Sequence, residues 1–193
     1  MKNKPKQERV TNPVRSAASG IGADPLGQIV LVEPEIPNNT GSIARTCVGF
    51  GLGLHLVHPL GFDIDEKACR RAGLDYWPRV RLTEHADVHA YQSTMRSSPS
   101  FWLFSARASR SLLDVEFSPG DHLVFGRESA GLPEAMTSVH PDRCVSIPLA
   151  PGERSLNVSN AAAIVAFEFV RSMVGQGLAG LDPEGRLCNS SMI

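Results

Sequence analysis

A strand, a polar loop and a long apolar helix follow one another between Val145 and Val170, and this unit constrains the fold more than any other part of the chain. The strand ends at Pro148 and the helix begins near Asn157. Apolar side chains surround most of the helix axis, which predicts burial, so the rest of the chain must cover the helix. Its first turn presents unpaired N–H groups to the preceding loop. We therefore expect that loop to bind a ligand that carries carboxylate, phosphate or carbonyl oxygens.

Earlier parts of the chain repeat the order of strand, loop and helix. Residues 28–33 form a near-continuous apolar run, typical of a strand covered on both faces of a parallel sheet, and a helix over residues 42–50 follows a polar loop. Further strands are predicted at residues 54–57, 100–105 and 121–125, and further helices at residues 65–74 and 83–95. The alternation predicts an α/β fold with a mainly parallel sheet and helices on both faces.

Length and composition fit one domain between two tails. The chain has 193 residues, 42% of them hydrophobic, which is enough for a single core over residues 28–175. Residues 1–27 combine basic residues with Pro, Gly and Ser, which predicts a disordered N-terminal tail, with an organellar targeting peptide as the alternative. Residues 176–193 are rich in Gly, Asp, Pro and Ser, and we expect a flexible C-terminal tail there.

Charge, cysteine spacing and hydropathy limit the partners. A net charge of -1 excludes a protein that coats nucleic acid with a basic surface on all sides. Any RNA contact must therefore be concentrated on one face. The four cysteines show no Cys-x-x-Cys spacing, so the sequence indicates neither a zinc site nor a disulfide framework. We therefore expect the protein to work in the reducing cytoplasm. His85 and His89 share a predicted helix but lack a third ligand, so we expect no metal. No apolar run approaches the roughly 20 residues of a membrane span, so we expect no membrane association.

Three polar loops follow three predicted strands, at residues 33–41, 126–133 and 147–156. Because parallel strands end at one edge of a sheet, these loops predict a shared binding site, although each alone reads as an ordinary turn. A basic cluster that contains Tyr76 and Trp77 is a second candidate. It is either an RNA surface that stacks a base or a solvated helix face over two core aromatics, and it comprises Lys67, Arg70, Arg71, Arg79 and Arg81.

Four motifs, in matching order, resemble those of the TrmL (YibK-like) branch of the SPOUT (SpoU/TrmD) RNA methyltransferases. The first runs from Glu33 to Arg45 and contains Pro-Asn-Asn-Thr-Gly, and the second is Arg71-Ala-Gly-Leu-Asp-Tyr76. The third is Phe125-Gly-Arg-Glu-Ser-Ala-Gly-Leu-Pro133, and the fourth joins Ile147-Pro-Leu to Arg154-Ser-Leu-Asn-Val-Ser-Asn160. The resemblance spans residues 28–175 and leaves both tails outside.

The resemblance implies transfer of a methyl group from S-adenosyl-L-methionine to the ribose 2'-hydroxyl of the wobble pyrimidine of tRNA, a cytidine or a modified uridine. It also implies a SPOUT-type C-terminal trefoil knot and a homodimer, neither of which composition or periodicity would suggest. Three alternatives stay open: an rRNA ribose 2'-O-methyltransferase of the same superfamily, a non-catalytic RNA-binding dimer, and a nucleotide-binding α/β enzyme that does not act on RNA.

The resemblance also assigns site residues. Arg45 and Asn157 would be catalytic, Asn39, Arg71 and Arg154 would contact RNA, and the cofactor would lie against Phe104, Gly126, Glu128, Ile147, Leu149 and Ser155. Gly126, Ile147 and Leu149 suit adenine, which needs an apolar slot with backbone donors and acceptors. Since a guanidinium stays protonated, we expect Arg45 to clamp a phosphate and to stabilise a developing alkoxide, the alternative being a structural arginine on a helix surface.

Overall fold

The computed structural model describes residues 24–63, 75–95 and 100–189. The predictions for residues 1–23, for the helix at residues 65–74 and for Arg71 therefore lie outside the described residues. Within the described ranges, seven strands form one sheet in the order β3-β2-β1-β6-β4-β7-β5, and every neighbouring pair is parallel. The strands are β1 (Gln28–Val32), β2 (Gly53–Val57), β3 (Arg81–His85), β4 (Phe101–Phe104), β5 (Arg110–Ser111), β6 (His122–Phe125) and β7 (Cys144–Ser146).

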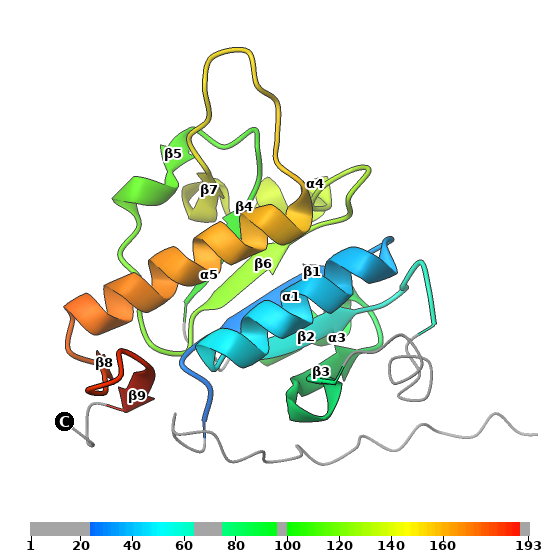
Figure 1. Ribbon diagram of the computed structural model, residues 1–193. Helices are drawn as coiled ribbons and strands as arrows, with labels where there is room; N and C mark the ends of the chain where they lie inside the picture. The colour runs from blue at the N-terminus through cyan, green and yellow to red at the C-terminus, as the bar shows by residue number, and fades with distance from the viewer. Residues whose placement is uncertain (1–23, 64–74, 96–99, 190–193) are drawn as a thin grey trace, which may run out of the picture.

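Helices cover both faces of the sheet, as the sequence predicts. Along β1, Ile29 and Leu31 face one core and Val30 and Val32 face the other, since successive strand residues point to opposite faces. The first core is completed by α1 (Pro37–Phe50) and α5 (Val158–Gly175), which lie side by side across the sheet (Figure 1). The second core is completed by α3 (Val88–Met95) and α4 (Glu134–Thr137).

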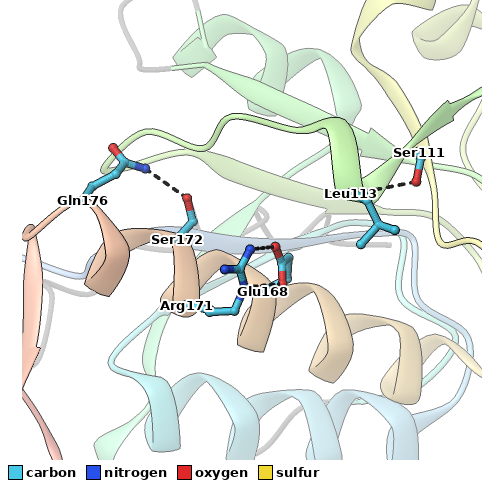
Figure 2. Close-up of polar contacts among 6 residues, drawn as sticks. All are labelled: Ser111, Leu113, Glu168, Arg171, Ser172 and Gln176. Carbon is cyan, nitrogen blue, oxygen red and sulfur yellow. Dashed lines mark hydrogen bonds and ion pairs between the residues drawn. The ribbon is translucent and has the colours of Figure 1, made fainter.

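The apolar composition of α5 reflects its place in the first core. The helix buries Val165, Ala166, Phe169 and Met173 against the sheet and α1. By length and composition alone it is the one helix of the described ranges that could cross a membrane, and its packing in this core accounts for the same composition. Toward its C-terminal end the helix carries polar pairs on its surface. Arg171 pairs with Glu168, and Gln176 donates to Ser172 (Figure 2).

Two helix boundaries differ from the sequence predictions. Residues 83–95 do not form one helix, because residues up to His85 belong to β3, which pairs with β2, and Asp87 then caps α3 by accepting from the N–H of Ala90 at 2.7 Å. Helix α1 begins at Pro37 rather than at residue 42. Proline suits the first turn, where its missing N–H would have no helical partner.

The C-terminal segment also differs from the expected flexible tail. Within residues 176–189 the strands β8 (Ala179–Leu181) and β9 (Leu187–Asn189) form an antiparallel hairpin beside the end of α5 (Figure 1). Ala179 and Cys188 are buried, and Leu187 packs against the first core. Burial of these apolar side chains stabilises the hairpin. The many turn-forming residues around them favour the prediction of a tail instead.

Candidate functional site

Three of the predicted cofactor residues lie at the carboxyl ends of neighbouring strands. β4 lies between β6 and β7, and Phe104 is paired with Val145, so Ile147 follows two residues further along. The rings of Phe104 and Phe125 stack with centroids 4.9 Å apart, and Gly126 comes directly after Phe125. The sheet therefore brings Phe104, Gly126 and Ile147 to one edge, and the two stacked rings supply an apolar wall there.

Gly126 is required by the turn that follows β6. Arg127 and Gly131 exchange two backbone hydrogen bonds, of 3.1 and 2.8 Å, and Gly131 has a left-handed φ of 73°. A Cβ on Gly126 would overlap the backbone of Gly131 and of Leu132. Glycine is thus the residue that lets this loop fold back closely on itself at the sheet edge.

Glu128, which the sequence assigns to the cofactor, holds the start of α1. Its carboxylate accepts from the N–H of Glu35 at 2.8 Å, from the N–H of Ile36 at 3.3 Å and from Asn39 Nδ2 at 2.9 Å. Partial burial acts to raise the pKa of Glu128, but the hydrogen bonds from Asn39, Glu35 and Ile36 outweigh it and lower the pKa. An anionic carboxylate therefore sits at the amino end of α1, where the helix dipole favours it.

Asn39 links this carboxylate to the last loop. While its Nδ2 donates to Glu128, its Oδ1 accepts from Asn157 Nδ2 at 3.1 Å. Asn157 in turn caps α5, because its Oδ1 accepts from the N–H of Ser159 at 2.9 Å and from the Ser159 hydroxyl at 2.6 Å. We call this series of side chains, Glu128, Asn39 and Asn157, the amide relay. It ties the loops after β1, β6 and β7 together.

Two further contacts hold the first and second loops against each other. The Glu35 carboxylate accepts from the N–H of Ser129 at 2.9 Å and from its hydroxyl at 2.8 Å. Arg127 forms an ion pair with Glu33, whose backbone is left-handed with φ of 52°. Sequence analysis missed Glu35 and Ser129 as positioning residues, since over ninety positions separate them and only the adjacency of β1 and β6 brings them together.

Arg45 lies further along α1, above an anchored aromatic ring. Its guanidinium carbon is 4.5 Å from the centre of the Tyr76 ring, and Nη2 is 3.4 Å from Asp75 Oδ1. Both charged side chains are largely exposed, so the ion pair is weak and open to competition by a ligand. The Tyr76 hydroxyl donates to the carbonyl oxygen of Gly41 at 2.8 Å, which fixes the ring against α1.

The remaining predicted residues separate into two groups. Leu149, Arg154 and Ser155 lie on the exposed loop between β7 and α5, which projects from the body of the protein (Figure 1). Tyr76 and Trp77 are buried in the first core, so they do not form an exposed base-stacking platform. The two aromatics are therefore core residues, while the basic residues Lys67, Arg70 and Arg71 lie outside the described residues.

A histidine cluster lies apart from this site, around Tyr91 of α3. His55 Nδ1 and His85 Nε2 are 3.0 Å apart, and His122 Nδ1 is 3.0 Å from the hydroxyl of buried Tyr91. Burial, followed by the neighbouring histidines, lowers the pKa of His55 to about 3. Across the described ranges, no group of three or more His, Cys, Asp and Glu residues is arranged to hold a metal ion.

The parallel sheet, with the loops after β1, β6 and β7 joined at its carboxyl edge, defines a protein with the SPOUT methyltransferase fold. Residues 27–167 match the SpoU rRNA Methylase family, and the chain belongs to this family. The resemblance read from the four motifs is thereby confirmed.

Individual relatives narrow the comparison. The tRNA (cytidine(34)-2'-O)-methyltransferase of Burkholderia pseudomallei (strain 1106a) is 43% identical over 151 residues, which cover 77% of this chain and 97% of that protein. A putative RNA methyltransferase from Bacillus anthracis is similar in structure, with a TM-score of 0.72, 38% identity, and coverage of 75% of this chain and 92% of that one. A structure that gives insight into the 2-OH methylation of C/U34 on tRNA has a TM-score of 0.71 and 41% identity. The match covers 77% of this chain and 96% of that one.

Proposed function

We propose that the protein transfers a methyl group from S-adenosyl-L-methionine to the ribose 2'-hydroxyl of nucleotide 34 of tRNA, a cytidine or a modified uridine. The observation that carries the proposal is the amide relay, which joins the loops after β1, β6 and β7 at one sheet edge. Relatives that cover most of the chain at about 40% identity are named for this reaction, which supports tRNA over rRNA as the substrate. We place the reaction in the cytoplasm.

The residues at the sheet edge fit the proposed cofactor. Phe104 and half-buried Ile147 offer apolar surface to an adenine ring, and the backbone around Gly126 offers donors and acceptors. Leu149 and Ser155, on the exposed loop, would close over the other side. When bound, the sulfonium donor supplies an electrophilic methyl group, so the protein has to align a hydroxyl and manage one proton.

We assign Arg45 and Arg154 to orienting the RNA. Both guanidiniums are exposed, and that of Arg45 is steadied by the Tyr76 ring. A protonated guanidinium does not accept the hydroxyl proton, so we assign Arg45 to clamping a phosphate and stabilising the developing alkoxide, with the proton passing to a neighbouring group or to water. Asn39 and Asn157 use their relay hydrogen bonds within the protein, and we assign both to positioning the loops around the substrate.

We also propose a homodimer formed through α1 and α5. Phe167 and Ile164 on α5 are 59% and 42% exposed, and the Phe167 ring lies 6.3 Å from that of Phe50 on α1. Exposed aromatic and aliphatic groups on two adjacent helices favour association with a second copy. Sedimentation should show a dimer that Phe167→Glu converts to a monomer and that Leu181→Glu, on the hairpin, leaves intact. A wild-type monomer would contradict the proposal.

The C-terminal trefoil knot belongs to the same proposal. The resemblance implies that the carboxyl-terminal segment, in which α5 is the last helix of the described residues, passes through a loop of the chain.

The direct test is methyl transfer to RNA. Purified protein is incubated with labelled S-adenosyl-L-methionine and either unmodified tRNA or rRNA, and the nucleosides are analysed by mass spectrometry. We expect labelled 2'-O-methylcytidine or 2'-O-methyluridine derivatives from tRNA. Label in rRNA alone would favour the ribosomal alternative, and cofactor binding without any transfer would favour a non-catalytic RNA-binding protein.

A further inference from the structure

We propose that Arg107 binds a backbone phosphate of the RNA next to the nucleotide that is methylated, an inference that rests on the proposed function. Arg107 lies three residues beyond Phe104, in the turn that leaves the carboxyl end of β4. The N–H of Ala108 donates to the carbonyl oxygen of Ser105 at 3.1 Å, and the N–H of Arg107 donates to the Ser105 hydroxyl at 3.3 Å. These two bonds close the turn and fix the backbone of Arg107 at the sheet edge that carries the site.

Two other cations near this edge have partners within the protein. Arg127 forms an ion pair with Glu33, and Arg45 contacts Asp75 and the Tyr76 ring. Arg107, in contrast, is exposed, and within the part of the chain that the structure describes its side chain makes no ion pair. Its guanidinium is therefore available to an anion without first breaking an internal contact.

The charges of the surrounding segment also favour anion binding at Arg107. Residues 101–113 include Arg107 and Arg110 but no acidic residue. The Arg110 guanidinium is held within the protein, because its carbon is 4.8 Å from the centre of the buried Trp102 ring and Nη2 donates to the carbonyl oxygen of Asp114 at 2.9 Å. Arg107 is thus the side chain of this segment that presents positive charge to a ligand.

The chemistry of the site points to a phosphodiester as the anion. The proposed methyl donor is a cation at its sulfonium, so a second cation at the same edge is favourable only with an anion between or beside them. A ribose 2'-hydroxyl is flanked by backbone phosphates, and an exposed guanidinium can bind two phosphate oxygens at once. The competing anion is the carboxylate of the cofactor itself, and the two assignments predict different losses.

The test measures RNA and cofactor binding separately. For Arg107→Gln we expect tRNA affinity to fall about tenfold or more, as for one lost hydrogen bond between charged groups, and the KM for tRNA to rise in parallel. The slope of log affinity against log salt should shrink by about 0.7 to 0.9, the value for one phosphate contact. Binding of S-adenosylhomocysteine should not change. Arg107→Lys should keep most of the salt slope, and Arg186→Gln, in the exposed hairpin turn, is the matched control.

Each outcome decides the question. Unchanged tRNA affinity and salt slope in Arg107→Gln would overturn the inference, as would a loss of S-adenosylhomocysteine affinity, which would assign the guanidinium to the cofactor carboxylate. Failure of the proposed function would look different, because the wild-type protein itself would then transfer no methyl group to tRNA.

Discussion

Replacing Glu128 with glutamine changes one carboxylate oxygen into an amide nitrogen at a point where three N–H groups converge. The wild-type carboxylate accepts from Glu35, Ile36 and Asn39 at 2.8, 3.3 and 2.9 Å. A glutamine keeps one acceptor oxygen and turns an NH2 group toward the remaining donors. We therefore expect Glu128→Gln to break the amide relay even though its shape is nearly the same.

The magnitude follows from the bonds that are lost. A hydrogen bond to a charged group contributes about 1.5 to 3 kcal/mol, and the site is only partly buried, so we expect the free energy of unfolding to fall by roughly 2 kcal/mol. The pH dependence has a definite sign. Because the pKa of Glu128 is lowered in the folded state, its contribution is present above the unfolded pKa and is lost as the pH falls through the folded value.

Urea unfolding and steady-state methyl transfer measure the two consequences. We expect lower stability and lower kcat/KM in Glu128→Gln, while Glu116→Gln, an exposed carboxylate outside the site, behaves as wild type. Asn39→Asp should be at least as damaging, since it places a carboxylate against Glu128. If Glu128→Gln retained both wild-type stability and turnover, the relay would not hold the loops, and the reasoning would be refuted.

Three further outcomes are expected. Gly126→Ala should cost about 1 to 3 kcal/mol in urea unfolding, because its Cβ overlaps the following turn, whereas Gly49→Ala, with open space around it, should be neutral or stabilising; equal stability of the two variants would be inconsistent with the turn geometry. The pKa of His55 is about 3 in the folded protein and 6.5 in the unfolded chain, so the free energy of unfolding should fall by about 2 kcal/mol as the pH is lowered from 7.5 to 5. His55→Gln should flatten this pH profile. An equally steep profile in the variant would assign the fall to other groups. Arg45→Lys keeps the charge but loses the planar fork, so kcat/KM should fall about tenfold or more; near-wild-type turnover with unchanged tRNA affinity would rule out fork-specific positioning.

Periodicity and turn chemistry predict much of the fold. The apolar run before Pro34 predicts β1, and Asn157 is recognisable as the start of α5 because an asparagine there can cap the first turn. The boundary of β3 was missed because Thr83 looks like a helix cap, while the pairing of β3 with β2 depends on contacts that a local pattern does not contain.

The site is predicted less completely than the fold. The motifs indicate which loops matter, but the role of Glu128 depends on a contact with Ile36 across 92 positions of sequence. Helix α1 begins at Pro37 without a side-chain cap of its own, since a carboxylate from a distant loop accepts from the N–H groups beside it. When a distant side chain accepts from backbone N–H groups, the local sequence around those groups contains no pattern that predicts it.

The most direct test of the account uses a tRNA anticodon stem-loop that carries a single 2'-deoxynucleotide. With labelled S-adenosyl-L-methionine, the proposed reaction predicts that 2'-deoxy substitution at nucleotide 34 abolishes label incorporation, while the same substitution at the preceding nucleotide leaves it intact. Label that persists in the RNA substituted at nucleotide 34 would contradict methylation of that hydroxyl.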